Sequence, residues 1–354
     1  MQEIRVELTK NPKQKPAPGA PLPFGTIFTD HMFIMNYDEG WHDPRIVPYG
    51  PIEMDPSAMC LHYGQSVFEG MKAYRAQDGR ILLFRPDKNM ARLNVSNDRL
   101  CIPPIDEELA KAAIEKLVSV EKDWVPSEEG TSLYIRPFII GVDPHIGVHP
   151  AHHLLFMVIC CPVGAYYPEG LDPVKIYVET NYVRAVRGGM GFTKTAGNYA
   201  ASLKAQDEAE KQDYTQVLWL DGVERKYIEE VGTMNVFFVI DDEVVTPALQ
   251  GSILSGITRM SCIEMLKSWG MKVSERRLSI QEVADAAAEG RLKEAFGTGT
   301  AAVISPIGHL KWGDDIMEIN NGEIGPLSQK LYDTLTGIQW GKIKDEFGWT
   351  VEVK

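Results

Sequence analysis

The order of apolar segments along the chain constrains its fold more than any other feature. Strand-length apolar runs and segments of helical periodicity follow one another irregularly. The clearest strands are expected at 133–140, 154–161 and 216–220, and the clearest helices at 86–100, 106–121, 258–269 and 280–288. A hairpin is expected at 73–84, because the Asp78-Gly79 turn has apolar flanks. This mixture predicts a mixed α/β (α+β) fold, without the regular alternation of a doubly wound parallel sheet.

A length of 354 residues suggests two domains. Residues 1–23 are predicted to form an extended, proline-rich arm, because 10–23 hold five prolines. Residues 163–174 combine Gly, Pro and Asp without periodicity, which indicates an interdomain loop, and its tyrosines make it a candidate lid. The predicted domains are therefore a small N-terminal one at 24–162 and a large C-terminal one at 175–354.

Charge and cysteine usage exclude several classes of protein. A net charge of −13 argues against nucleic-acid binding, which requires a dense basic surface. No apolar run approaches the ~18 residues that a membrane span requires. The five cysteines show no Cys-x-x-Cys or Cys/His ligand spacing, so no metal is expected. A reduced, cytoplasmic protein fits this usage best.

A glycine-rich loop at 188–197 places Lys194 just before a predicted helix. Such a lysine can be a surface amine, a phosphate ligand or an imine-forming nucleophile. The loop is not a nucleotide-binding P-loop, because Phe192 and Thr193 separate Lys194 from the nearest glycine. The imine-forming interpretation gains weight, although the surface alternative stays open at this point.

Three further segments of the second half could complete a phosphate and carbonyl site. Residues 254–259 precede a helix, whose free amide groups can bind an anion, although a plain helix cap is the alternative. Residues 297–302 form a predicted small-residue loop that could hold a phosphate or could be a simple turn. Glu229 and Glu230 lie between two predicted strands, where a carboxylate either faces solvent or serves as an acid partner.

The first half offers an anion-binding and aromatic set. Arg92 lies on a predicted helix, where solvent exposure is the usual fate of an arginine. Strand periodicity puts Tyr134 and Arg136 on one face, where they could meet a substrate carboxylate. His62, Tyr63 and Phe68 could form aromatic walls, although aromatic side chains more often lie in the core.

Taken together, these segments resemble the branched-chain amino acid aminotransferases, which are fold type IV pyridoxal-phosphate enzymes. The resemblance covers almost the whole chain after the arm, in family order. The matching segments are 28–32 (FTDHM), 61–63 (LHY), 68–73 (FEGMKA), 89–92 (NMAR), 133–137 (LYIRP), 194–199 (KTAGNY), 230–235 (EVGTMN) and 299–301 (GTA).

The resemblance implies roles for individual residues. Lys194 would be the Schiff-base lysine and proton carrier, Glu230 would pair with the pyridine nitrogen, and Tyr199 would hydrogen-bond the ring hydroxyl. The phosphate would be held by Arg92, Thr300 and the backbone of Ile257 and Thr258. Substrate carboxylates would be bound by Tyr63, Arg136 and the backbone of Thr300 and Ala301, and the side-chain pocket would be walled by Phe24, Phe68 and Tyr134.

The family also implies a reaction and an assembly. Amino groups would pass between L-leucine, L-isoleucine or L-valine and 2-oxoglutarate, with pyridoxal 5'-phosphate as cofactor bound by the C-terminal domain. The alternatives are D-amino acid transamination, aminodeoxychorismate lyase activity, and a non-catalytic phosphate-ligand binding protein. Family members are usually homodimers of two-domain chains with a loop over the site, so a homodimer is expected here.

Overall fold

The computed structural model describes residues 2–164 and 171–354. Residues 165–170, which include both tyrosines of the predicted lid, lie outside the described residues. The chain divides into two compact units. The first unit contains the residues up to 164 with Lys194–Ala196 and Gly337–Lys354, and the second contains 171–193 with Gly197–Thr336. The domain bounds expected from the sequence place Lys194–Ala196 and Gly337–Lys354 in the C-terminal domain instead. These bounds stay a prediction.

A mainly antiparallel sheet forms the framework of the first unit. Among the described residues it has nine strands in the order β1-β3-β2-β8-β7-β5-β6-β18, with β4 paired to β7. The strands are β1 (Arg5–Val6), β2 (His31–Asp38), β3 (Trp41–Pro48), β4 (Ser66–Phe68), β5 (Met71–Arg75), β6 (Ile81–Phe84), β7 (Ser132–Gly141), β8 (His153–Val163) and β18 (Thr350–Glu352). The predicted hairpin at 73–84 is confirmed as β5 and β6.

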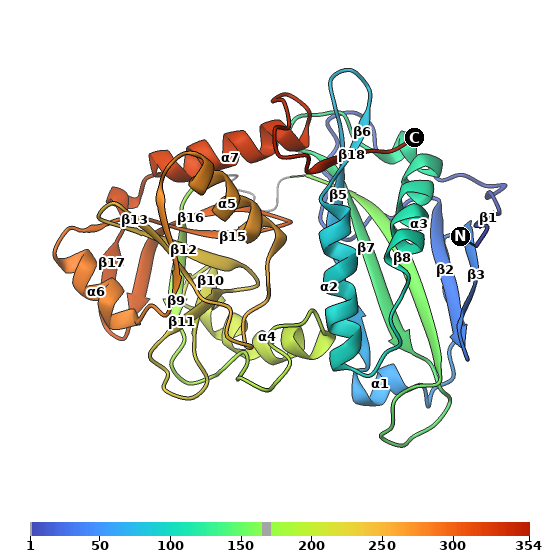
Figure 1. Cartoon of the computed structure of the whole chain (residues 1–354), viewed down its shortest axis with the longest axis horizontal. Coiled ribbons are helices and arrows are strands. Elements are labelled where there is room, and N and C mark those ends of the chain that lie inside the picture. Colours follow the sequence, from blue (N-terminus) through green and yellow to red (C-terminus); the bar gives the residue numbers. More distant parts are fainter. Residues whose placement is uncertain (1, 165–170) are drawn as a thin grey trace. The chain divides into compact units, whose positions relative to one another are not determined.

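Helices α2 (Pro86–Arg99) and α3 (Glu107–Val120) cover one face of this sheet (Figure 1). Leu93 of α2 and Leu117 of α3 pack with Ile135 and Val158 from the sheet in one apolar core. Because side chains alternate along a strand, Tyr134 and Arg136 lie on the opposite face from Ile135. The short helix α1 (Met59–Tyr63) and the 3-10 turn Lys122–Trp124 complete the unit.

The N-terminal arm is fastened to the first unit by buried polar side chains. The backbone N–H of Thr9 donates to His31 Nε2 at 2.8 Å, and that of Lys13 donates to Asp30 at 2.7 Å. His31 Nδ1 in turn bonds Glu121. Since Nε2 accepts, Nδ1 carries the proton and Glu121 holds the ring in that tautomer. The Asp30-His31 pair of the 28–32 segment therefore orders the arm.

A second sheet, of mixed parallel and antiparallel strands, forms the framework of the second unit. In the described part of the chain it has nine strands in the order β11-β10-β9-β16-β15-β12-β13-β14, with β17 paired to β16. The strands are β9 (Val174–Val178), β10 (Gln216–Leu220), β11 (Ile228–Val231), β12 (Asn235–Ile240), β13 (Glu243–Pro247), β14 (Lys272–Arg276), β15 (Leu292–Gly299), β16 (Val303–Trp312) and β17 (Asp315–Glu318).

Helices pack on this second sheet through alternating strand residues. Val217 and Trp219 of β10 pack with Ala205 and Ala209 of α4 (Ala196–Glu210), whereas Leu218 belongs to a cluster that includes α6 (Ile280–Ala288). The other helices are α5 (Ile257–Ser268), α7 (Pro326–Gln339) and the 3-10 turn Asn320–Gly322. The expected mixture of strands and helices is thus confirmed.

Two expectations about local structure are wrong. Residues 297–299 do not form a loop but end strand β15, where Gly297 pairs with Ser305, and only the following residues turn. Glu229 and Glu230 do not lie between strands but within β11. In both places small or charged residues mimic a loop, while pairing with neighbouring strands makes the segment extended.

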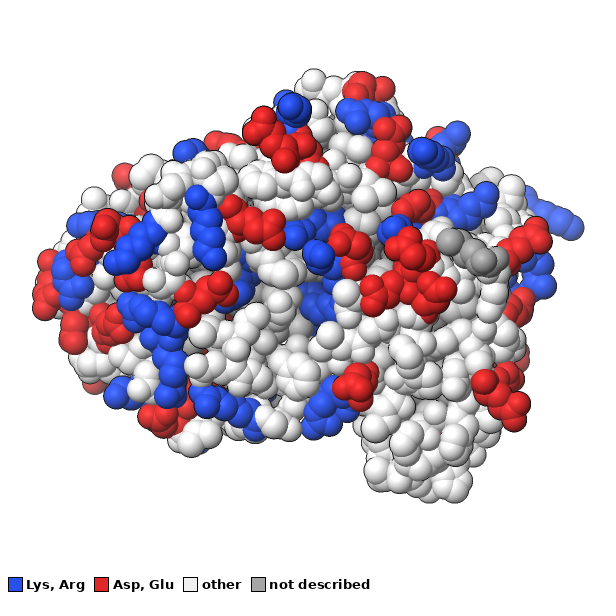
Figure 2. Space-filling model, viewed as in Figure 1, with Lys and Arg blue, Asp and Glu red and all other residues white. Residues whose placement is uncertain are grey.

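The surface carries charges of both signs, which are interspersed on the face seen in Figure 2. In the described part of the chain, none of the helices has the length and apolar character that crossing a membrane requires.

Candidate active site

Hydrogen bonds to both backbone groups of Lys194, its N–H and its carbonyl, hold this residue in place. Its N–H donates to Ser96 Oγ of α2 at 2.9 Å, and its carbonyl accepts from the N–H of Phe68 at 3.0 Å. Thr195 extends this attachment, because it forms an antiparallel bridge with Val67. The Lys194 Nζ lies 5.0 Å from the centre of the Phe68 ring. The side chain is therefore aimed from an anchored backbone onto an aromatic surface.

The same aromatic ring carries a second cation, Arg136. Its guanidinium carbon lies 4.5 Å from the Phe68 ring centre, and Nη2 donates to Tyr134 Oη at 3.0 Å. The predicted pairing of Tyr134 and Arg136 on one face is confirmed. Among the described residues, the buried Arg136 Nε has no hydrogen-bond partner. A guanidinium with an unused buried donor suits a carboxylate ligand.

The predicted aromatic wall is only partly assembled. Phe24 packs edge-on against Tyr134 with ring centres 4.8 Å apart. Tyr63 lies at the end of α1, is 42% exposed, and has its ring near His62. Among the described residues, no ring contact or hydrogen bond joins Tyr63 to Arg136. The structure thus brings Phe24, Phe68 and Tyr134 together with Arg136 but does not add Tyr63 to them.

Arg92 is buried rather than exposed on its helix. Its Nε and Nη2 each donate to the carboxylate of Glu69 at 2.8 Å, and Glu69 is fully buried. Asn89 Nδ2 donates to the same carboxylate at 2.8 Å. A two-point pair of this kind fixes the plane of the guanidinium. Glu69 therefore positions the predicted phosphate ligand, a role that the sequence did not reveal.

In the second unit, Glu230 forms a buried ion pair. Its Oε2 lies 3.3 Å from Arg184 Nε, and its Oε1 accepts the N–H of Leu254 at 2.8 Å. Arg184 itself also donates to the carbonyl of Ser252. An adjacent arginine and a backbone donor both favour the ionised carboxylate. Glu230 is thus equipped to accept a hydrogen bond from a protonated ring nitrogen.

Tyr199 and Glu230 line one small cavity. The other lining residues are Arg184, Thr193, Asn198, Ser202, Gly232, Thr233 and Leu254. Thr193 and Asn198 bracket Lys194 in the sequence, and Asn198 Nδ2 donates to the carbonyl of Thr193 at 2.8 Å. The structure therefore groups the predicted partners of the pyridine nitrogen and the ring hydroxyl.

The neighbouring Glu229 is distinguished from Glu230 by its surroundings. Its side chain accepts a hydrogen bond from Ser252, while its Oε2 has no partner among the described residues. Burial raises the pKa of Glu229, outweighing the lowering effect of Ser252 and Arg184. Alternation along β11 points the two glutamates to opposite faces.

Ile257 and Thr258 begin the 12-residue helix α5, with Gly256 as its N-cap. The first amide groups of a helix have no partners within it and favour an anion. A Cβ on Gly256 would lie 1.9 Å from Asn235 Oδ1. Asn235 Nδ2 donates to the carbonyl of Leu254 at 2.9 Å, so it braces the segment that enters the helix. Glycine is therefore required here for close packing.

Thr300 and Ala301 occupy the turn that joins β15 to β16. The turn ends at Val303, which has a φ of +63°. A β-branched residue rarely adopts this left-handed conformation, so the turn stores local strain. Strained turns of this kind are concentrated at ligand-binding positions.

Sequence reasoning missed Glu69 and Arg184. Glu69 stands inside a matching segment but shows no spacing that links it to Arg92, 23 residues away. Arg184, which lies in the connection between β9 and α4, has no local signal, because its importance depends on the approach of Glu230 from β11. Both contacts are tertiary.

Comparison with known proteins identifies the family of this chain. The amino-transferase class IV family model matches residues 66–310. Branched-chain-amino-acid aminotransferase 2 of Bacillus subtilis is 62% identical over 99% of this chain and 97% of that protein. Branched-chain-amino-acid transaminase 1 of the same organism is 58% identical over 99% of both chains.

A solved structure shows the same fold. The branched-chain amino acid aminotransferase of Escherichia coli superimposes with a TM-score of 0.76 at 26% identity, over 92% of this chain and 99% of that one. A further branched-chain amino acid aminotransferase, solved with pyridoxamine 5'-phosphate, gives a TM-score of 0.75 at 27% identity, over 90% and 98% of the two chains. The chain belongs to the class IV aminotransferases, and among them to the branched-chain-amino-acid aminotransferase family.

Proposed function

We propose that this enzyme transfers the amino group between L-leucine, L-isoleucine or L-valine and 2-oxoglutarate, with glutamate as the second product. The observation that carries the proposal is the Phe68 ring, which holds both Lys194 and Arg136. An amine and a carboxylate-binding guanidinium on one ring suit a substrate that has an amino group beside a carboxylate. The 55–62% identity of full-length relatives supports the same activity.

Class IV aminotransferases use pyridoxal 5'-phosphate, and the residues of this chain fit it. Glu230, paired with Arg184, would hold the pyridine nitrogen in its protonated form, and Tyr199 would bond the ring hydroxyl. Arg92, Thr300 and the amides of Ile257 and Thr258 would hold the phosphate. When bound, the cofactor accepts the electrons that the substrate α-carbon releases.

Lys194 is the proposed catalytic acid and base. Its Nζ would take the α-proton of the bound amino acid substrate. In the second half of the cycle the same amine would return a proton to 2-oxoglutarate's α-carbon. The Ser96 and Phe68 hydrogen bonds keep the backbone of Lys194 in place while its side chain moves.

The substrate residues are proposed to serve two kinds of side chain. Phe24, Phe68 and Tyr134 would pack against a branched aliphatic group, while Arg136 at the edge of these rings would meet the γ-carboxylate of glutamate. The backbone amides of Thr300 and Ala301 would bind the α-carboxylate, with Tyr63 as a further contact. The unused donor of Arg136 supports this division.

A steady-state assay tests the proposed activity. We expect transfer from L-leucine, L-isoleucine and L-valine to 2-oxoglutarate, and little from D-alanine. Lys194→Ala should bind the cofactor without turnover, whereas Lys204→Ala, on the exposed side of α4 beside Glu208, should retain activity. Equal rates with D-alanine would favour the D-amino acid alternative, and a colourless protein that takes up no cofactor would contradict the enzyme proposal.

A homodimer and a cytoplasmic location are also proposed, on the basis of the family and of the free thiols. Light scattering should then give twice the chain mass of 39.6 kDa. All five cysteines are unbridged, which fits a reducing compartment.

A further inference from the structure

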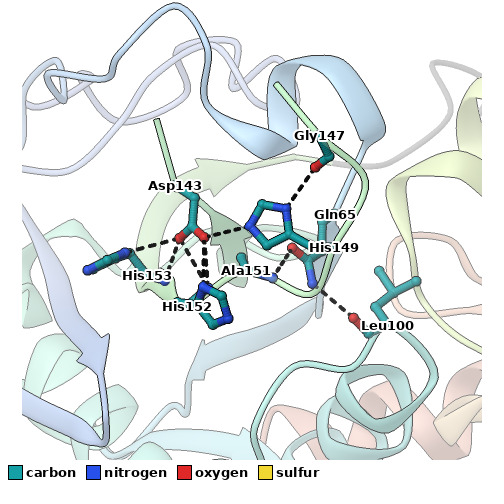
Figure 3. Close-up of polar contacts among 8 residues, drawn as sticks. All are labelled: Gln65, Leu100, Asp143, Gly147, His149, Ala151, His152 and His153. Carbon is teal, nitrogen blue, oxygen red and sulfur yellow. Dashed lines mark hydrogen bonds and ion pairs between the residues drawn. The ribbon is translucent and has the colours of Figure 1, made fainter. Parts of the chain in front are cut away.

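The segment 143–153, which joins β7 to β8 and includes the first residue of β8, contains four of the eight histidines of the chain. His149, His152 and His153 all approach Asp143, as Figure 3 shows, and His145 packs against His149. The aminotransferase proposal uses none of these residues. Between Arg136 and Lys175 the sequence has no lysine or arginine that could repel a cation.

The carboxylate at the centre is built into the loop. Asp143 is buried and accepts the backbone N–H groups of His152, at 2.9 Å, and His153, at 2.5 Å. Two backbone donors therefore hold this carboxylate at the base of the loop.

The hydrogen bonds of His149 show which nitrogen faces this carboxylate as an electron-pair donor. Its Nδ1 lies 2.8 Å from the Gly147 carbonyl, which can only accept, so Nδ1 carries a proton. Its Nε2 lies 3.1 Å from Asp143 Oδ2. If the ring is neutral, the lone pair of Nε2 faces the negative carboxylate, which is unfavourable. The contact becomes favourable when a cation, either a proton on Nε2 or a metal ion, lies between the two atoms.

The side chains of Asp143, His149 and His152 also gather their ligand atoms around one point, as a metal site requires. His152 Nδ1 approaches the same Asp143 Oδ2, at 3.6 Å, and the three ligand atoms all lie within 4.8 Å of one another. Ligands about 2.0–2.1 Å from a tetrahedral zinc ion are about 3.3 Å apart. In addition, metal-binding histidines usually donate their other N–H to a carbonyl or carboxylate, as His149 does to Gly147.

We propose that Asp143 Oδ2, His149 Nε2 and His152 Nδ1 form a zinc site with water in the fourth position. The site would stabilise the β7–β8 loop. Ala151, between the two histidines, donates to Gln65 Oε1 at 3.2 Å, and Gln65 Nε2 donates to the Leu100 carbonyl at the end of α2 at 2.9 Å. A metal here would therefore brace the loop against the helix that carries Arg92 and Ser96.

Zinc titration of the untagged holoenzyme against a chromophoric chelator tests this site. We expect one zinc ion per chain and at least about a tenfold loss of affinity in His152→Gln and in His149→Gln, the minimum for disturbing a metal site. The His152 side chain is 79% exposed, so its variant should fold normally, which cofactor absorbance will verify. His42→Gln is the matched control, because His42 also pairs with one aspartate, Asp38, and no further ligand group joins this pair among the described residues.

The pattern of affinities decides the question. Weakening by both loop variants, with His42→Gln unchanged, supports the site. The proposal is overturned if the unmodified enzyme binds no zinc. It is also overturned if zinc affinity is unchanged in His149→Gln or His152→Gln, or falls equally in His42→Gln. Aminotransferase activity plays no part in this readout, so the test is independent of the proposed function.

Discussion

Arg184 is a residue whose importance depends on a single buried contact. It lies beside Glu230 and donates to the Ser252 carbonyl, so it fixes both the charge and the place of the carboxylate. Removing one partner of a buried ion pair costs about 3–5 kcal/mol, because the other charge stays without compensation.

We therefore expect Arg184→Gln to weaken cofactor binding. The buried Glu230 carboxylate would lose its neighbouring cation in the variant, and we expect the cofactor dissociation constant to rise at least about tenfold. Spectrophotometric titration with pyridoxal 5'-phosphate measures this. Arg187→Gln is the control, since Arg187 bonds the exposed Gln250. Equal affinities in the two variants would remove the proposed role of Arg184.

Arg136 is a second single residue with a testable role, and the effect of replacing it should depend on the substrate. Its loss should remove a charge-assisted hydrogen bond to the γ-carboxylate of glutamate, worth about 1.5–3 kcal/mol. We expect Arg136→Gln to raise the KM for glutamate about 10- to 100-fold, and that for leucine far less. Arg75→Gln, on β5 of the same sheet, serves as control, because Arg75 donates to the backbone carbonyls of Lys122 and Val125. Equal losses for both substrates would exclude the assignment.

At the scale of elements, the start of α5 depends on close packing. The φ of Gly256 is −69°, which any residue adopts, so only the contact with Asn235 excludes a side chain. We expect Gly256→Ala to displace the first turn and raise the cofactor dissociation constant, while Gly40→Ala, in open space, leaves it unchanged. Cofactor titration measures both. Unaltered binding by Gly256→Ala would show that this turn does not hold the phosphate.

Elements with a local signal were predictable, and those that depend on neighbours were not. Helix α6 matches its predicted range because its Ser279 cap and amphipathic pattern are local. Strand β3 escaped notice because Pro44 and Pro48 suggest turns, although both are tolerated near a sheet edge. Helix α7 begins where Glu294 accepts the N–H groups of Leu327 and Ser328, a cap that comes from a distant strand.

The candidate site follows the same rule. Its chemically distinctive residues, Lys194, Glu230 and Arg136, were identifiable from segments of sequence. The residues that position them, Ser96 and Arg184, were not, because each acts across a tertiary contact.

At the scale of the whole molecule, chain order and spatial grouping differ. Lys194–Ala196 belong to the first unit, although the residues on both sides belong to the second. The first unit thus contains the amine and the substrate-binding arginine, and the second contains Glu230 and Tyr199. No local pattern in the sequence could reveal that a three-residue segment leaves its neighbours in this way.

The stability of the folded chain should depend on pH through Lys72. Burial lowers the pKa of Lys72 from 10.5 to about 8. Between these values the unfolded chain binds a proton that the folded chain has released, so the free energy of unfolding rises with pH. The rise attributable to Lys72 is at most about 3 kcal/mol across this window, and below pH 8 the cost of burying the charge is present in full.

Urea unfolding of the holoenzyme at several pH values from 7.5 to 10.5 would measure this dependence. The comparison is with Lys72→Met, which keeps the apolar stem of the side chain but has no amine. We expect the variant to be more stable than the unmodified protein at the lower pH, and its free energy of unfolding to rise less with pH. Part of the rise should remain, because other lysines and tyrosines titrate equally in both proteins. If the two curves run parallel, Lys72 is already neutralised or solvated in the folded state, and the burial of its charge does not limit stability.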